Sequence, residues 1–344
     1  MTRRTVRISG TSHPLLDIHS FGRAGPQSRP FTAAEIQQIA RTVRRTPEVM
    51  VKVTGGGAKV GTVAAHLAYI SRDGDLEIET DDGESVRNRD EQKQLLNDWH
   101  LELTTGHFRK PATKQAAHRQ TRLVHNIVLS MPSPTPPEKV LAAARKFARE
   151  KFGAQHRYAM VLHTDQKHPH VHMVLKAESE RGRRLHIDKE RLRDWREDFA
   201  RLMREQGVAA NATRRAIRGQ EQRKNPDAIL RAQRHGDSTA IRKGVRAVAA
   251  ELFRTGHVLD PARARLIELR KTTIARWTSI ADMLTAQGES TLADEVRRFV
   301  HGLPPSITDR ERIAQALTRY PEGARDTYGS RVSPPRRRGD DFTR

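Results

Sequence analysis

Apolar residues recur with two different periods along the middle of this chain. Short apolar runs bounded by turn residues predict strands. They span residues 49–53, 123–132, 158–163 and 170–175. Apolar positions three or four residues apart predict amphipathic helices within residues 62–72, 136–152 and 189–206. Strands and helices alternate irregularly, so we expect an α+β fold with a central antiparallel sheet and flanking helices.

The pattern changes near Asn225, beyond which it predicts helices only. These lie within residues 239–256, 260–288 and 290–302. We therefore expect a helical C-terminal region after the sheet domain. The expected divisions are a basic, partly flexible N-terminal arm (1–45), the sheet domain (46–225), a helical accessory domain (226–328) and a disordered basic tail (329–344).

The charge of the chain favours a polyanionic partner such as nucleic acid. Lys and Arg number 63 against 41 Asp and Glu, giving a formal charge of +22 and a pI near 11.0. No cysteine is present, so thiolate chemistry and disulfides are excluded, and any metal must bind His, Asp, Glu or Asn. No apolar run is long enough for a signal peptide or a membrane span, which predicts a cytoplasmic protein.

The segment "HTDQKHPHVHMVLKA", residues 163–177, contains four histidines. Its two apolar flanks predict a hairpin of central strands. His170 and His172 then point to the same side of the sheet, and His163 faces them from the neighbouring strand. Three converging imidazoles predict a metal site with open coordination positions. His168 lies in the turn, and we expect it to support a ligand or to contact DNA rather than to bind the metal.

A nucleophile for such a site can be sought among the four tyrosines of the chain. Tyr158 points away from His163, because the two are five residues apart on one strand, and Tyr320 and Tyr328 lie in the C-terminal region. Tyr69 remains, on a predicted helix that follows a triple-glycine turn, with His66 one turn before it. Its other interpretation is a half-buried helix aromatic.

Several segments together resemble a known family. "GGGAKVGTVAAHLAYISRDGDLEIET", "HNIVLSMP", "HTDQKHPHVHMVLK" and "LHIDKERLRDWREDFARLMREQGVAANATRRAIRG" follow one another as in the P-type mobilisation relaxases. This branch of the HUH endonucleases includes plasmid conjugative relaxases and the T-DNA border endonuclease of agrobacteria. The resemblance covers about residues 48–220 and implies the HUH relaxase palm as the fold of the sheet domain.

The resemblance implies roles for particular residues. It places the nucleophile at Tyr69, a DNA-positioning serine at Ser130, and the metal ligands at His163, His170 and His172. Asp165 keeps its family position, where it is expected to hydrogen-bond a ligand imidazole. Two positions depart from the family: Lys167 stands where an Asp is common, and Lys176 where an Asn is common. These departures leave the proton acceptor open between His66 and His168.

The activity implied is a strand- and site-specific nick in single-stranded DNA at an origin of transfer, through a 5′-phosphotyrosine, followed by rejoining. A phenol is a weak nucleophile at neutral pH and needs a base or a nearby cation. Mg²⁺ or Mn²⁺ is the expected metal, and accessory relaxosome proteins and a type IV coupling protein are expected partners. The alternatives are a non-catalytic DNA-binding mobilisation protein and a hydrolytic metallonuclease in which Tyr69 stacks on a base.

Two charged segments lie outside these motifs. Residues 213–224 are rich in arginine and suit either phosphate contacts or a solvated linker. Residues 73–85 are acidic, and Leu76 and Ile78 alternate with Glu77 and Glu79. This alternation predicts an amphipathic edge strand whose acids face water or a basic neighbour.

Overall fold

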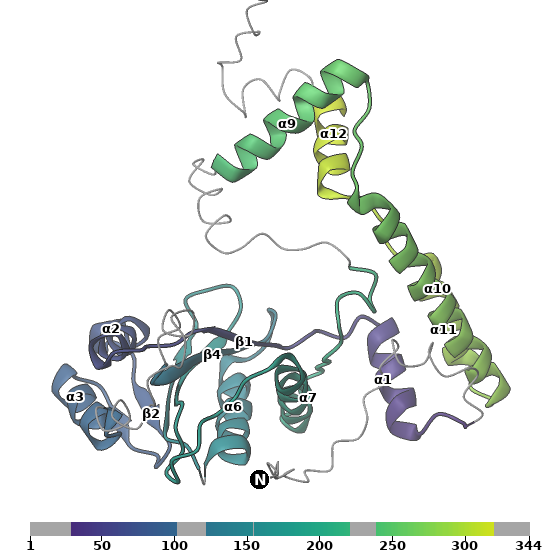
Figure 1. Ribbon diagram of the computed structural model, residues 1–344. Helices are drawn as coiled ribbons and strands as arrows, with labels where there is room; N and C mark the ends of the chain where they lie inside the picture. Colours follow the sequence, from purple (N-terminus) through teal and green to yellow (C-terminus); the bar gives the residue numbers. More distant parts are fainter. Residues whose placement is uncertain (1–28, 102–121, 154, 221–238, 320–344) are drawn as a thin grey trace, which may run out of the picture. The chain divides into compact units, whose positions relative to one another are not determined.

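The computed structural model describes residues 29–101, 122–153, 155–220 and 239–319. These residues divide into two compact units, which we call the sheet unit (residues 29–214) and the helical unit (residues 215–319) (Figure 1). Three predicted features lie outside the described residues. They are the domain boundary near Asn225, the end of the arginine-rich segment with Arg223 and Lys224, and the C-terminal tail.

The sheet unit is built on six antiparallel strands in the order β1-β4-β6-β5-β2-β3. Their bounds are Met50–Gly55 (β1), Ile78–Thr80 (β2), Ser85–Val86 (β3), Val124–Ser130 (β4), Tyr158–His163 (β5) and His170–Lys176 (β6). The predicted hairpin of β5 and β6 occupies the centre of the sheet. This confirms the α+β fold with a central antiparallel sheet that the sequence predicted.

One face of the sheet is covered by α6 (Pro137–Phe152) and α7 (Lys189–Glu205) (Figure 1). Phe147 of α6 is completely buried there, and its ring lies 6.0 to 6.2 Å from those of Phe152, Trp195 and Phe199. Tyr158 packs into the same core, on the face opposite His163, as the strand period predicted.

We expect Phe147→Ala to lower the free energy of unfolding by about 3–5 kcal/mol, because it removes buried area and leaves a cavity. Phe253→Ala is the matched control, since the Phe253 side chain on α9 (Thr239–Thr255) is 95% exposed and should change stability by less than about 0.5 kcal/mol. Urea unfolding followed by tryptophan fluorescence measures both. Equal effects of the two substitutions would contradict this assignment of the core.

The opposite face of the sheet is covered by α2 (Val60–Ile70) and α3 (Arg89–Asp98). The sequence predicted α2 but not α3, whose composition is mostly polar. Asn88 begins α3 with a capping box that involves Glu91, and Leu95 and Leu96 bury the inner side of the helix. The last residue of α2, Ile70, lies against the histidine end of β5 and β6, where its carbonyl bonds His163.

A helix also lies within the segment that we assigned to the N-terminal arm. It is α1 (Ala33–Val43), which begins at a capping box of Thr32 and Glu35 and buries Ile39 completely. Asn211 ties the end of α1 to the strand region through a 3.2 Å hydrogen bond from Nδ2 to Oγ1 of Thr42. Residues 33–43 are therefore part of the sheet unit rather than of a flexible arm.

The acidic segment forms β2, which pairs with β5 on one side and with β3 on the other. We predicted that this strand lies at the edge of the sheet, which was wrong. It is the second strand from the edge, because the two-residue β3 pairs with its outer side. The acids do face basic neighbours: Glu79 bonds Arg145 on α6 at 2.7 Å, and Asp81 bonds Arg157. These ion pairs account for the local excess of acid in a basic chain.

The helical unit contains α9, α10 (Ala262–Ala286), α11 (Ser290–His301) and α12 (Asp309–Arg319). Helix α10 packs along α11, and α9 packs on α12. Trp277 is completely buried, with its ring 5.2 Å from that of Phe299 and its Nε1 donating to the carbonyl of Ile217 at 2.8 Å. The described helices include none with the length and apolar character needed to cross a bilayer.

Candidate active site

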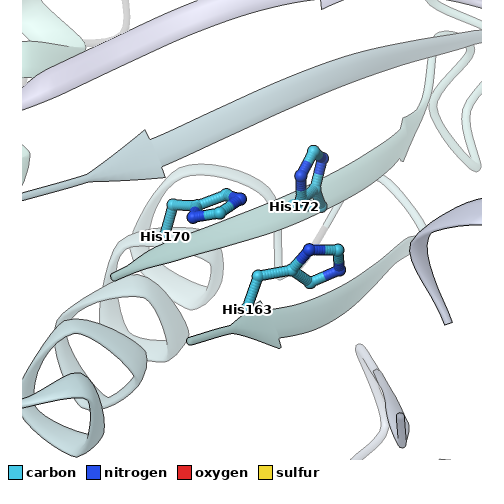
Figure 2. A group of neighbouring side chains, drawn as sticks. All are labelled: His163, His170 and His172. Atoms are coloured by element: carbon cyan, nitrogen blue, oxygen red, sulfur yellow. The ribbon is translucent and has the colours of Figure 1, made fainter. Parts of the chain in front are cut away.

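Three histidines gather on one face at the end of the central hairpin. His163 of β5 pairs with His170 of β6 in the ladder, and His172 lies two residues further along β6, so all three side chains project to the same side (Figure 2). Their ring centroids are 4.6 to 5.1 Å apart. One nitrogen from each ring lies within 4.8 Å of the others. This is the grouping that strand parity predicted.

Two of these rings are oriented by backbone carbonyls. Nε2 of His163 donates to the carbonyl of Ile70 at 2.6 Å, and Nδ1 of His170 donates to the carbonyl of His168 at 3.0 Å. Because a carbonyl only accepts, the proton of each neutral ring is assigned to the bonded nitrogen. The remaining nitrogen of each ring keeps its lone pair, which is the arrangement that orients histidines around a metal.

The surroundings of His163 and His172 favour their neutral forms. Burial, and after it the electrostatic influence of His163, His170, His66 and Arg72, together lower the pKa of His172 to about 3. Burial also lowers the pKa of His163. Neutral imidazole is the form that coordinates a divalent ion, so three imidazole donors fit a divalent transition-metal ion such as Mn²⁺ with open positions.

Tyr69 lies on α2, the helix whose last residue, Ile70, accepts the bond from His163. The glycine turn before α2 approaches β4 so closely that a Cβ on Gly56 would lie 2.1 Å from the carbonyl oxygen of Val124, so only glycine fits there. Helix α2 buries Val63, Leu67 and Ile70, whereas Tyr69 is 66% exposed. The alternative of a half-buried packing aromatic therefore does not describe Tyr69.

His66 is the imidazole that neighbours both the tyrosine and the triad. Its ring centroid lies 6.3 Å from that of Tyr69 and 6.5 Å from that of His172. Burial lowers the pKa of His66, which favours its neutral form. Within the described part of the chain its buried Nε2 has no hydrogen-bond partner.

Ser130 and His168 hold the turn of the hairpin. The buried hydroxyl of Ser130 donates to the carbonyl of Pro169 at 3.1 Å. Nδ1 of the exposed His168 accepts from the backbone N–H of Ser133 at 3.1 Å. His168 lies outside the cluster of potential ligands, as expected from its place in the turn. Both side chains thus fix loop geometry directly beside the triad.

Asp165 differs from what the resemblance implied. Its Oδ1 lies 3.9 Å from Nδ1 of His163, which is beyond hydrogen-bond distance, so the expected bond to a ligand imidazole is not formed. The carboxylate instead pairs with Arg72. Arg72 follows α2 in a left-handed backbone conformation with φ of 55°. This places a guanidinium beside the triad, a feature that the sequence analysis missed although Arg72 is only three residues after Tyr69.

Comparison with known proteins bears on this site. Residues 79–208 match the family model described as "Relaxase: MobA/VirD2-like, nuclease domain". The T-DNA border endonuclease VirD2 of Agrobacterium fabrum is 29% identical over 195 residues, which cover 50% of this chain and 41% of that protein. The VirD2 of Rhizobium rhizogenes is 28% identical over the same length and is covered to 42%. The chain thus spans about two fifths of the length of these curated relatives.

A solved structure of the MobM relaxase domain, bound to plasmid pMV158 oriT DNA and to Mn, also resembles the chain. The two sequences are 15% identical, and the matched region covers 54% of this chain and 98% of the MobM relaxase domain. The TM-score is 0.36, so we base no argument on this likeness. The family match and the curated relatives together show that the sheet unit is similar to the nuclease domain of the MobA/VirD2-like relaxases.

Proposed function

We propose that this protein nicks single-stranded DNA at an origin of transfer through Tyr69 and later rejoins the strand, in conjugative transfer or mobilisation. The observation that carries the proposal is the exposed Tyr69, which neighbours His66 and through it the histidine triad, on a domain similar to the relaxase nucleases. A non-catalytic DNA-binding protein would have no need for this combination. Single-stranded substrate suits the site, because an exposed phenol has to reach one phosphate of a flexible strand.

The reaction is a transesterification. The hydroxyl oxygen of Tyr69 attacks phosphorus, the bond from phosphorus to the 3′ oxygen breaks, and the strand is left with a 3′-hydroxyl and a 5′-phosphotyrosine. His66 can accept the phenolic proton, since it is neutral and neighbours Tyr69. The proton needed by the leaving oxygen returns from the same or another acid. Reversal by a 3′-hydroxyl rejoins the strand without an external energy source.

A divalent ion, Mg²⁺ or Mn²⁺, held by His163, His170 and His172 would supply positive charge at the non-bridging oxygens of the scissile phosphate. The ring-to-carbonyl bonds of His163 and His170 preorganise the donors before any ion binds. The basic balance of the chain supports binding of the strand on either side of the reacting phosphate. Accessory relaxosome proteins and a type IV coupling protein remain the expected partners.

Incubation of the full chain with single-stranded origin DNA and Mn²⁺, followed by denaturing electrophoresis, tests the proposal. An SDS-stable protein–DNA adduct is expected. DNA cleaved without any adduct would favour the hydrolytic metallonuclease instead, in which Tyr69 stacks on a base. Neither cleavage nor an adduct, with the substrate bound, would favour the non-catalytic DNA-binding protein.

Arg72 offers a further test of the site. We expect Arg72→Ala to slow adduct formation about tenfold to hundredfold, because it removes a cation beside the phosphate and releases Asp165 from its partner. Arg89→Ala is the control, since Arg89 forms an exposed ion pair with Asp73, the residue after Arg72. Initial rates of adduct formation measure both variants. A rate for Arg72→Ala within twofold of the unsubstituted chain would show that this guanidinium does not act on the phosphate.

A further inference from the structure

A cavity of about 400 Å³ lies between the loop that joins β4 to α6 and the turn of the β5–β6 hairpin. Proline rings supply much of its wall, with Pro134 and Pro136 on one side and Pro169 on the other. The hairpin side adds the polar side chains of Thr164, Gln166 and Lys167. Apolar walls with a few convergent polar groups are the usual composition of a small-ligand site, and the volume lies within the range of such sites.

The two walls of this cavity are joined by hydrogen bonds. The hydroxyl of Ser130 and the backbone N–H of Met131 both donate to the carbonyl of Pro169, and His168 accepts from the N–H of Ser133. The proline-rich loop is further closed by the bond from Oγ1 of Thr135 to the carbonyl of Pro132 at 2.7 Å. The cavity is therefore held open before any ligand arrives, which reduces the entropic cost of binding.

Two residues that line the cavity are neighbours in sequence of the triad histidines. Thr164 directly follows His163, and Pro169 directly precedes His170. A strand whose phosphate lies at the triad passes the end of the hairpin that carries these residues, so a neighbouring nucleotide can reach the cavity. The cavity is too small for a duplex and has room for an unstacked nucleoside, whose base can lie against proline rings and hydrogen-bond to Thr164 or Gln166.

Resting on the proposed function, we propose that this cavity binds the nucleoside adjacent to the scissile phosphate and selects its base, while Lys167 contacts the backbone phosphate beside it. Gln166 carries both an amide donor and an amide acceptor, which suits the edge of an unpaired base. Lys167 carries a cation on an exposed side chain, which suits a phosphate and reads no sequence. Base selection and salt dependence are thus assigned to different residues.

The test uses the full chain, Mn²⁺ and a pool of single-stranded oligonucleotides with a randomised stretch. Protein-linked fragments and released 3′-hydroxyl fragments are sequenced, which gives the base preference on both sides of the nick. Gln166→Trp fills the cavity, Lys167→Ala removes its cation, and Lys189→Ala, at the exposed start of α7, is the charge control. Circular dichroism verifies folding of each variant.

We expect Gln166→Trp to lower selection roughly tenfold at one position next to the nick and to leave the other positions unchanged. Lys167→Ala should keep the base preference and reduce the slope of log affinity against log salt for a dT₃₀ probe by about one, which Lys189→Ala should not do. If Gln166→Trp forms adducts with an unchanged base preference, or if Lys167→Ala keeps the same salt slope, this inference is overturned while the proposed function stands. The absence of any adduct from the unsubstituted chain would overturn the proposed function, and this inference with it.

Discussion

Tyr69→Phe is expected to abolish the SDS-stable adduct between the protein and single-stranded DNA, with a loss of at least about a thousandfold in its rate of formation. The substitution removes the only atom of this side chain that can bond to phosphorus, and it keeps the ring that packs or stacks. Binding of the same oligonucleotide, measured by fluorescence anisotropy, should stay within about twofold, because aromatic stacking is retained. This difference between chemistry and binding separates a nucleophile from a DNA-contacting aromatic.

Tyr158→Phe is the matched control for this experiment. It removes the same hydroxyl from a tyrosine that is 4% exposed in the core on the opposite face of the sheet. Adduct formation should therefore persist in that variant. An adduct that survives in Tyr69→Phe would contradict the proposed nucleophile, and an adduct lost in both variants would point to a structural effect instead.

The second large effect is expected on metal binding. We expect His172→Ala to weaken the affinity for Mn²⁺ by at least about a hundredfold, because loss of a group that merely orients a ligand already costs 10- to 100-fold. Mn²⁺ should raise the melting temperature of the unsubstituted chain by mass action, and His172→Ala should lose this increase. Isothermal titration calorimetry and thermal unfolding with and without Mn²⁺ measure both effects without relying on catalysis.

His186→Ala serves as the control for the metal experiment. His186 is exposed just before α7 and lies outside the cluster of potential ligands, so its loss should leave Mn²⁺ affinity unchanged. Equal Mn²⁺ affinity of His172→Ala and the unsubstituted chain would contradict the assignment of the triad. A melting temperature already lowered without Mn²⁺ would instead measure the contribution of His172 to packing.

The sequence predicted correctly those parts of the fold that depend on strong local periodicity. Strand parity alone placed His170 and His172 on one side, because side chains alternate along any strand, and the hairpin pattern added His163. The same alternation placed Tyr158 on the opposite face. Helices α2, α6 and α7 were predicted from apolar spacing, because each buries one continuous stripe.

Weak local signals account for the elements that were missed. Helix α3 has few apolar residues, and its stability depends on capping at Asn88 and on contacts with α2 that a window of sequence does not contain. Helix α1 was hidden in a basic segment, although Thr32 and Glu35 carried the capping-box signal. The edge position of β2 was wrong because the two-residue β3 is too short to predict from sequence.

By itself, the sequence determined the class of the sheet and the convergence of the three histidines, because these follow from chain periodicity, and its resemblance to the relaxases singled out Tyr69 as the candidate nucleophile. Only the tertiary structure decided that Tyr69 is exposed, that His66 neighbours both Tyr69 and His172, and that Arg72 rather than His163 pairs with Asp165. The physical reason is separation along the chain. Arg72 and Asp165 are 93 residues apart, and their contact depends on how α2 packs against the hairpin, which no local pattern encodes.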